Sequence, residues 1–89
     1  MSEKIIFDAD SVVAILTDMK YCCDVLKQKN QEMEGYCKQL NDNFLDSDGE
    51  EIIGMIKKSQ KRIQDTEHKI RKLISKTCDY TEKILDLME

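Results

Sequence analysis

The chain has 89 residues, enough for one domain, and a single core of this size supplies only about 3–5 kcal/mol. Charged residues make up 36% of the sequence and apolar residues 40%, with three glycines and no proline, which is typical of long solvated helices. The net charge of −4 argues against general binding to nucleic acid or to acidic membranes. No apolar stretch approaches the roughly 18 residues of a membrane span, and no signal-peptide core follows the N-terminus. We therefore expect a cytoplasmic protein, with co-secretion without a cleaved signal peptide as the alternative.

The first predicted element is a helix over about residues 9–45. Asp8 and Asp10 are both candidates for its N-cap, because a short carboxylate there accepts hydrogen bonds from the free N–H groups of the first turn. Apolar residues then recur in 4-3-4-3 order, which places them in one stripe on a helix that packs along another helix. The members of this stripe are Val12, Leu16, Met19, Cys23, Leu26, Asn30, Met33, Cys37, Leu40 and Phe44.

A turn follows over about residues 46–49, where Asp46-Ser47-Asp48-Gly49 combines turn-forming residues with a cap for the next helix. The second helix is predicted over about residues 50–88 and carries its own 4-3-4-3 stripe. The members of this second stripe are Ile52, Ile56, Ser59, Ile63, Thr66, Ile70, Leu73, Thr77, Tyr80, Ile84 and Leu87. The sequence thus predicts an all-α, antiparallel two-helix hairpin that forms a single domain over residues 1–89.

Folding the two stripes against each other pairs residues whose numbers sum to about 96. This register places Asn30 opposite Thr66. A buried polar pair of this kind fixes the register of paired helices at some cost in stability. We therefore expect Asn30 and Thr66 to form the register layer of the hairpin.

Further apolar residues flank the two stripes near the open end of the hairpin. A lone hairpin cannot cover them, so we predict that they bind a helical partner and complete a four-helix bundle. The alternative is that they only widen the intramolecular seam. The predicted partner-binding residues are Val13, Ile15, Cys22 and Val25 in the first helix and Ile74, Cys78, Leu85 and Met88 in the second.

Residue patterns for catalysis, cofactors or metals are not found. His68 is the sole histidine, and Cys22-Cys23 is adjacent rather than spaced as C-x-x-C, so no zinc-ligand spacing occurs. Gly49 and Gly54 lack the strand and Lys-Ser/Thr context of a phosphate-binding loop. We expect no catalytic, cofactor-binding or metal-binding residues, and therefore a protein that is not an enzyme.

The chain resembles the WXG family of small helical-hairpin substrates and partners of type VII (ESX) secretion. The likeness rests on the length, on the apolar lead-in over residues 4–10, and on Phe44-Leu45-Asp46 at the end of the first helix. Phe44 and Asp46 form this turn motif in the place of the family's Trp-x-Gly, with Phe for Trp and Asp for Gly. The family's export signal, Tyr-x-x-x-Asp/Glu, is not matched, because Ile84 lies four residues after Tyr80.

This resemblance implies a signal-less partner, such as the small helical proteins that accompany LXG-type toxins. The function we expect is that of a non-enzymatic, chaperone-like targeting factor that binds the helical N-terminal region of such a toxin, or another small helical protein. The alternative is an intracellular homo-oligomeric coiled-coil adaptor or regulator with no role in export. A third reading, a nucleic-acid protein using the basic residues of the second helix, is disfavoured by interleaved acids and by the acidic whole chain.

Overall fold

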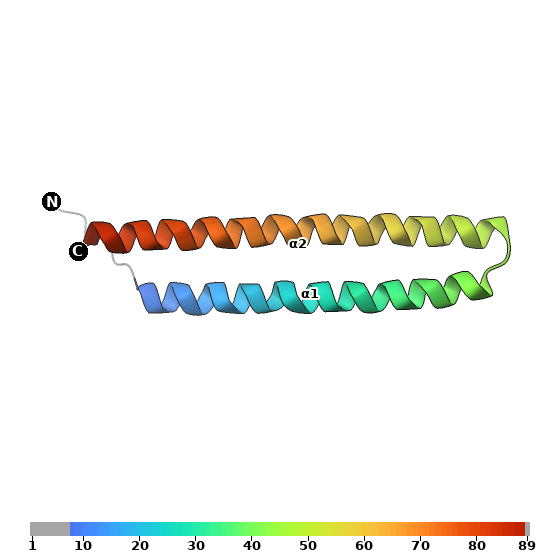
Figure 1. The fold of residues 1–89 in the computed structure, drawn as a ribbon, viewed down its shortest axis with the longest axis horizontal. Helices are drawn as coiled ribbons and strands as arrows, with labels where there is room; N and C mark the ends of the chain where they lie inside the picture. Colours follow the sequence, from blue (N-terminus) through green and yellow to red (C-terminus); the bar gives the residue numbers. More distant parts are fainter. Residues whose placement is uncertain (1–7, 89) are drawn as a thin grey trace.

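The computed structural model describes residues 8–88, so residues 4–7 of the predicted apolar lead-in over residues 4–10 lie outside the described part. Two long helices, α1 (Ala9–Asn43) and α2 (Ser47–Met88), lie side by side and antiparallel, joined by a short turn (Figure 1). The described chain measures 70 × 19 × 17 Å, which is the shape of a rod two helices wide. The predicted all-α hairpin is therefore confirmed for this part of the chain.

α1 begins where Asp8 caps it. The Asp8 carboxylate accepts hydrogen bonds from the backbone N–H of Ser11 at 3.1 Å and from its hydroxyl at 2.7 Å. These bonds, that of the hydroxyl first, hold the pKa of Asp8 below its ordinary value of 3.8. Because the pKa is depressed in the folded state, the cap stabilises the helix fully at a pH above the ordinary pKa value. This stabilisation is lost as the pH falls through the lower, folded-state pKa.

The turn is shorter than predicted, and α2 begins at Ser47 rather than at about residue 50. α1 ends at Asn43, and the N–H of Phe44 donates to the Leu40 carbonyl at 2.8 Å. The Asp46 carboxylate accepts a hydrogen bond from the backbone N–H of Gly49 at 2.7 Å, which satisfies a free donor in the first turn of α2. Gly49 therefore belongs to the first turn of the helix and not to the connection.

Gly49 is buried because Phe44 folds back over it. A Cβ built on Gly49 would lie 2.5 Å from the Phe44 Cβ and 3.0 Å from the Asp46 carboxylate. Its φ is not positive, so the reason for glycine here is space rather than backbone conformation. The predicted turn motif thus has a structural role: Phe44 covers the start of α2 and Asp46 caps it.

The seam between the helices uses two columns of residues on each helix. The inner columns are the more deeply buried, and Cys37, Cys23 and Ile53 are each no more than 3% exposed. The inner columns are Leu16, Cys23, Asn30 and Cys37 in α1, and Ile53, Gln60, Glu67, Ile74 and Thr81 in α2. The outer columns are Val12, Met19, Leu26, Met33 and Leu40 in α1, and Ile56, Ile63, Ile70, Thr77 and Ile84 in α2. The largest buried apolar cluster, Leu16, Cys23 and Ile74 with Val12 and Ile70, lies toward the open end.

The stripe predicted in α1 matches this seam, but half of the stripe predicted in α2 does not. The outer column, which includes Ile56, Ile70 and Ile84, was predicted correctly. The other predicted column, which includes Ile52, Leu73 and Tyr80, is exposed, and the column one residue further along the chain is buried instead. The sequence favoured the wrong column because the buried one contains Gln60, Glu67 and Thr81, whose polar character hides its role.

Two of the three glycines, Gly49 and Gly54, give a matched test of the turn. Gly49→Ala should destabilise the hairpin by about 1–3 kcal/mol, because the added methyl group collides with Phe44. Gly54→Ala, where nothing lies within 4 Å of the added Cβ, should instead stabilise it by roughly 0.5–1 kcal/mol through helix propensity. Thermal unfolding followed by circular dichroism measures both, and a Gly49→Ala variant as stable as Gly54→Ala would contradict the role assigned to Phe44.

Candidate protein-interaction surface

The seam meets solvent along two long edges of the hairpin, and different types of residue line the two edges. One edge, here called the polar flank, adjoins the inner columns and includes Lys27, Glu34, Lys57, Gln64 and Arg71. A groove runs along this edge and is lined by Lys27, Glu34, Lys57 and Gln64 among others, with Asn30, Gln60 and Cys37 at its base. Long polar side chains therefore border the inner columns on this side.

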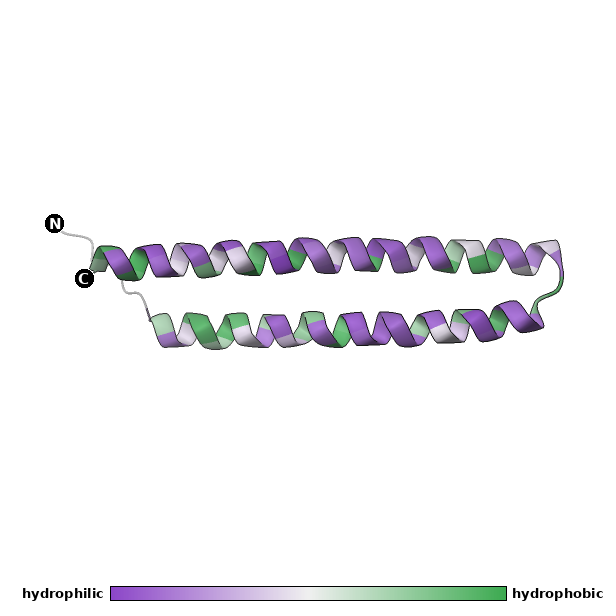
Figure 2. Ribbon diagram, in the orientation of Figure 1, coloured by the Kyte–Doolittle hydropathy of each residue, from purple (hydrophilic) through white to green (hydrophobic). Residues whose placement is uncertain are grey.

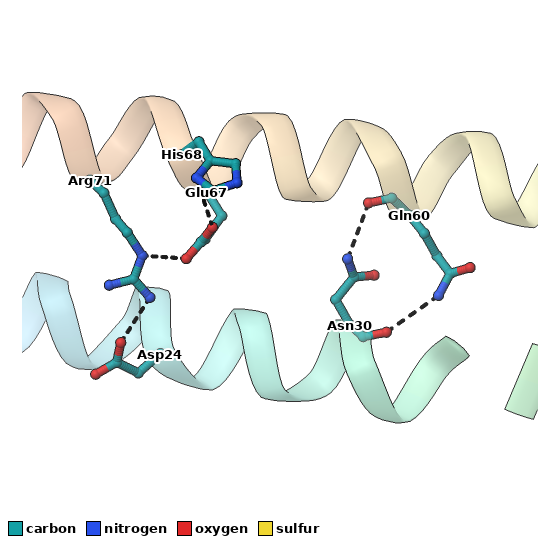
Figure 3. A network of polar contacts seen from close by, with 6 residues as sticks. All are labelled: Asp24, Asn30, Gln60, Glu67, His68 and Arg71. Atoms are coloured by element: carbon teal, nitrogen blue, oxygen red, sulfur yellow. Dashed lines mark hydrogen bonds and ion pairs between the residues drawn. The ribbon is translucent and has the colours of Figure 1, made fainter. Parts of the chain in front are cut away.

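Polar contacts cross the hairpin along this flank (Figure 3). Arg71 donates to Asp24 on α1 at 2.8 Å and also to Glu67, which is itself buried. The hydrogen bond to Asp24, then that to Glu67, raises the pKa of Arg71, so the guanidinium stays charged. Glu67 is tolerated at an inner position because this ion pair compensates its buried carboxylate. Spacing did not single out this network, because Asp24 and Arg71 both lie outside the seam columns.

The polar layer of the seam pairs Asn30 with Gln60 and not with Thr66. The Asn30 side-chain amide donates to the backbone carbonyl of Gln60 at 3.1 Å. The Gln60 side-chain amide donates in turn to the backbone carbonyl of Asn30 at 3.3 Å (Figure 3). Thr66 is exposed. The register prediction was therefore wrong in its partner for Asn30, because α2 presents its other column: the numbers of Asn30 and Gln60 sum to 90, while those of Asp24 and Arg71 sum to 95. The Asn30 side-chain oxygen is buried without a hydrogen-bond partner, so this layer costs stability.

The opposite edge, here called the apolar flank, adjoins the outer columns. Its apolar residues are Ile15, Cys22 and Tyr36 on α1 and Ile52, Leu73, Tyr80 and Leu87 on α2, together with the half-covered outer residues Met19, Met33, Leu40 and Ile63. The polar residues Lys29, Ser59 and Thr66 occupy the same flank columns near the middle of the hairpin. A groove lined by Met33, Ile52, Met55, Ile56 and Ile63 joins the two helices on this edge. Colouring by hydropathy shows apolar residues recurring along both helices, between polar ones (Figure 2).

Exposure on this scale separates the apolar flank from an ordinary helix surface. In the two outer and two flank columns between Val12 and Leu87, Lys29 is the one charged residue. Singly exposed apolar residues are normal, whereas many neighbouring exposed apolar residues bordered by charge mark an interaction surface. The sequence predicted exposed apolar residues only near the open end of the hairpin. In the structure the apolar flank runs along the whole hairpin.

The structure divides the predicted partner-binding residues into three groups. Ile15 and Cys22 are exposed on the apolar flank, and the half-buried Val25 lies at its border. Val13, Cys78 and Leu85 are exposed, but they lie on the side of the polar flank, and Met88 is exposed at the end of α2. Ile74 is buried in the seam, so its assignment to an exposed surface was wrong. The flank residues that were missed, Leu73 and Tyr80 above all, had been assigned to the seam.

The described residues offer nothing that points to catalysis or to a metal centre. Within residues 8–88, no group of three or more His, Cys, Asp or Glu side chains is placed to hold a metal ion. All four cysteines are free thiols, with Cys22 and Cys78 exposed on opposite flanks. Neither described helix is long and apolar enough to cross a membrane.

Comparison of this chain with protein-family models, with curated proteins and with solved structures finds no match. The geometry of the two flanks therefore carries the functional argument.

The Asn30–Gln60 layer predicts a gain of stability when it is replaced. The double variant Asn30→Leu/Gln60→Leu should raise the free energy of unfolding by about 1–3 kcal/mol, because it removes a partly unsatisfied polar layer. Asn30→Leu alone should gain less, because the Gln60 side chain, which can still donate to the backbone carbonyl of residue 30, stays in the layer as a polar group. Thermal unfolding at one fixed protein concentration measures this, and a double variant that melts below the natural protein would contradict the account of the layer.

Proposed function

We propose that this protein is a non-enzymatic adaptor that acts by burying its apolar flank against a helical partner. The observation that carries the proposal is the apolar flank itself, a band with one charged residue that extends along both helices of the hairpin. A two-helix rod has no interior for a substrate pocket, and its grooves are open channels along its edges. Contact is the activity that this shape supports best.

For the partner, we propose the helical N-terminal region of a type VII secretion cargo such as an LXG-type toxin. This part of the proposal is supported by the helical hairpin and by the resemblance of Phe44-Leu45-Asp46 to the WXG turn, where Phe44 and Asp46 hold the first turn of α2. The protein would bind its cargo as a chaperone-like targeting factor and complete a four-helix bundle with it. A cargo hairpin with its own apolar stripe would lie along Met33, Ile63 and Leu73.

A second candidate is a homo-oligomeric adaptor or regulator with no role in export. The charges that border the apolar flank favour it, because acids predominate beside α1 and bases beside α2, so one copy offers both signs to another. The two candidates use the same surface and differ in what covers it.

Adjacent residues of α2 allow a sharp test of the surface. Leu73 is 60% exposed on the apolar flank, whereas Ile74 is 9% exposed in the seam. Leu73→Glu should weaken binding of a co-expressed LXG-type N-terminal region on the order of 100-fold, because it places an unpaired charge in the interface. Ile74→Glu should unfold much of the hairpin, with a loss of about 3 kcal/mol or more.

The readouts are affinity purification of the tagged pair and helicity by circular dichroism. Leu73→Glu is expected to keep the helicity of the natural chain and lose the partner, while Ile74→Glu loses both. Unchanged capture by Leu73→Glu would remove the apolar flank from the interaction. If the natural chain captured no LXG-type region at all, the cargo assignment would fail even with the surface intact.

A further inference from the structure

We propose that, in the absence of cargo, a second copy of this chain covers the apolar flank, in a two-fold dimer that places both turns at the same end. This inference rests on the second candidate function, the homo-oligomer, and adds how the two copies are oriented; it is independent of the cargo proposal. It rests on three observations: the size of the flank, the charges along its two borders, and the level at which those charges lie.

The flank is large enough for a stable interface between two copies. α1 has 35 residues and is therefore about 50 Å long. The hairpin is 19 Å across, so the face offered to a second copy is on the order of 900 Å². Stable protein interfaces bury about 800 Å² on each partner, so one complete face is sufficient.

The borders of the flank carry opposite charge. On α2, the positions three residues after Ser59, Thr66, Leu73 and Tyr80 are all basic, namely Arg62, Lys69, Lys76 and Lys83. On α1, the equivalent positions three residues after Ile15, Cys22, Lys29 and Tyr36 are Asp18, Val25, Glu32 and Gln39, so two of the four are acidic and none is basic. Glu32 also neutralises Lys29, whose ammonium lies 3.1 Å from its carboxylate.

Two face-to-face arrangements of identical hairpins are compatible with a two-fold axis. An axis across the hairpin places the turns at opposite ends and sets α1 beside α1 and α2 beside α2, so four basic residues meet the same four. An axis along the hairpin places the turns at the same end and sets α1 of each copy beside α2 of the other. Like charges across an interface are unfavourable and opposite charges favourable, so the second arrangement is selected.

The heights of the charged residues along the hairpin agree with the arrangement that places both turns at the same end. An axis along the hairpin keeps every residue at its own height, and within one copy Asn30 is level with Gln60 and Asp24 with Arg71. Glu32 of one copy therefore comes within about one helical turn of Arg62 of the other. By the same reckoning Asp18 comes to the level of Lys76. Both acids of the α1 border thus meet a base.

Distances between spin labels at the turn distinguish the two arrangements. Leu45 is 92% exposed in the turn, and Cys22 and Cys78 are the exposed native thiols, so the variant Leu45→Cys/Cys22→Ser/Cys78→Ser carries its label at one accessible site. Neighbouring helices lie about 8–10 Å apart, so two labels at the same end should give a distance below roughly 30 Å in a pulsed dipolar measurement. Turns at opposite ends would give a distance near the 70 Å length of the hairpin.

A charge-reversal pair tests the cause of the orientation. Arg62→Glu/Lys76→Glu should weaken the dimer about tenfold or more in sedimentation equilibrium, because the new acids then face Glu32 and Asp18 of the other copy. Adding Asp18→Lys/Glu32→Lys should restore it. Long label distances, or rescue that does not occur, would overturn the proposed dimer. A chain that stays monomeric at high concentration yet captures a cargo helix would also overturn it, while leaving the proposed function intact.

Discussion

The structure depends on a mismatch between the apolar face of α2 and the surface that α1 can cover. α2 presents three neighbouring columns that carry apolar residues, represented by Ile74, Ile70 and Leu73. A helix packed against one partner buries about two columns, since the ridges of one helix fill the grooves of the other over a limited arc. The seam takes the inner and outer columns and leaves the third. The exposed apolar flank is the direct result.

The two edges of the seam are closed in different ways. On the polar flank, Arg71 joins Glu67 to Asp24 on the other helix. Within the inner columns, the side-chain amides of Asn30 and Gln60 each donate to the backbone carbonyl of the other residue. These interactions fix which residues face each other, and they contribute specificity more than stability. On the apolar flank nothing in the described chain performs this role, so the outer columns stay half exposed. The inner columns beside the polar flank are thus buried, whereas the outer columns beside the apolar flank remain partly exposed.

Sequence periodicity predicted the two helices, their antiparallel pairing and the whole α1 stripe, because heptad spacing and capping residues act locally. It misplaced half of the α2 seam, because Gln60 and Glu67 are buried while Leu73 and Tyr80 are exposed. The burial of Glu67 depends on its ion pair with Arg71, which also binds Asp24. Asp24 lies 47 residues from Arg71 in the sequence and outside every stripe. The same error moved Ile74 onto the predicted docking surface and Leu73 off it. Spacing alone does not decide which of two overlapping stripes packs inside a chain and which packs outside it.

Fluorine NMR of the protein labelled with fluorotyrosine tests the central claim, that the apolar flank is a docking surface, most directly. All three tyrosines are exposed in the isolated hairpin, but Tyr36 and Tyr80 lie on the apolar flank, while Tyr21 lies on the face of α1 opposite the seam. As the protein concentration rises, the Tyr36 and Tyr80 resonances should shift and lose solvent accessibility while that of Tyr21 stays constant. Three resonances that stay fixed at every concentration and with every helical partner, or a change confined to Tyr21, would contradict the account.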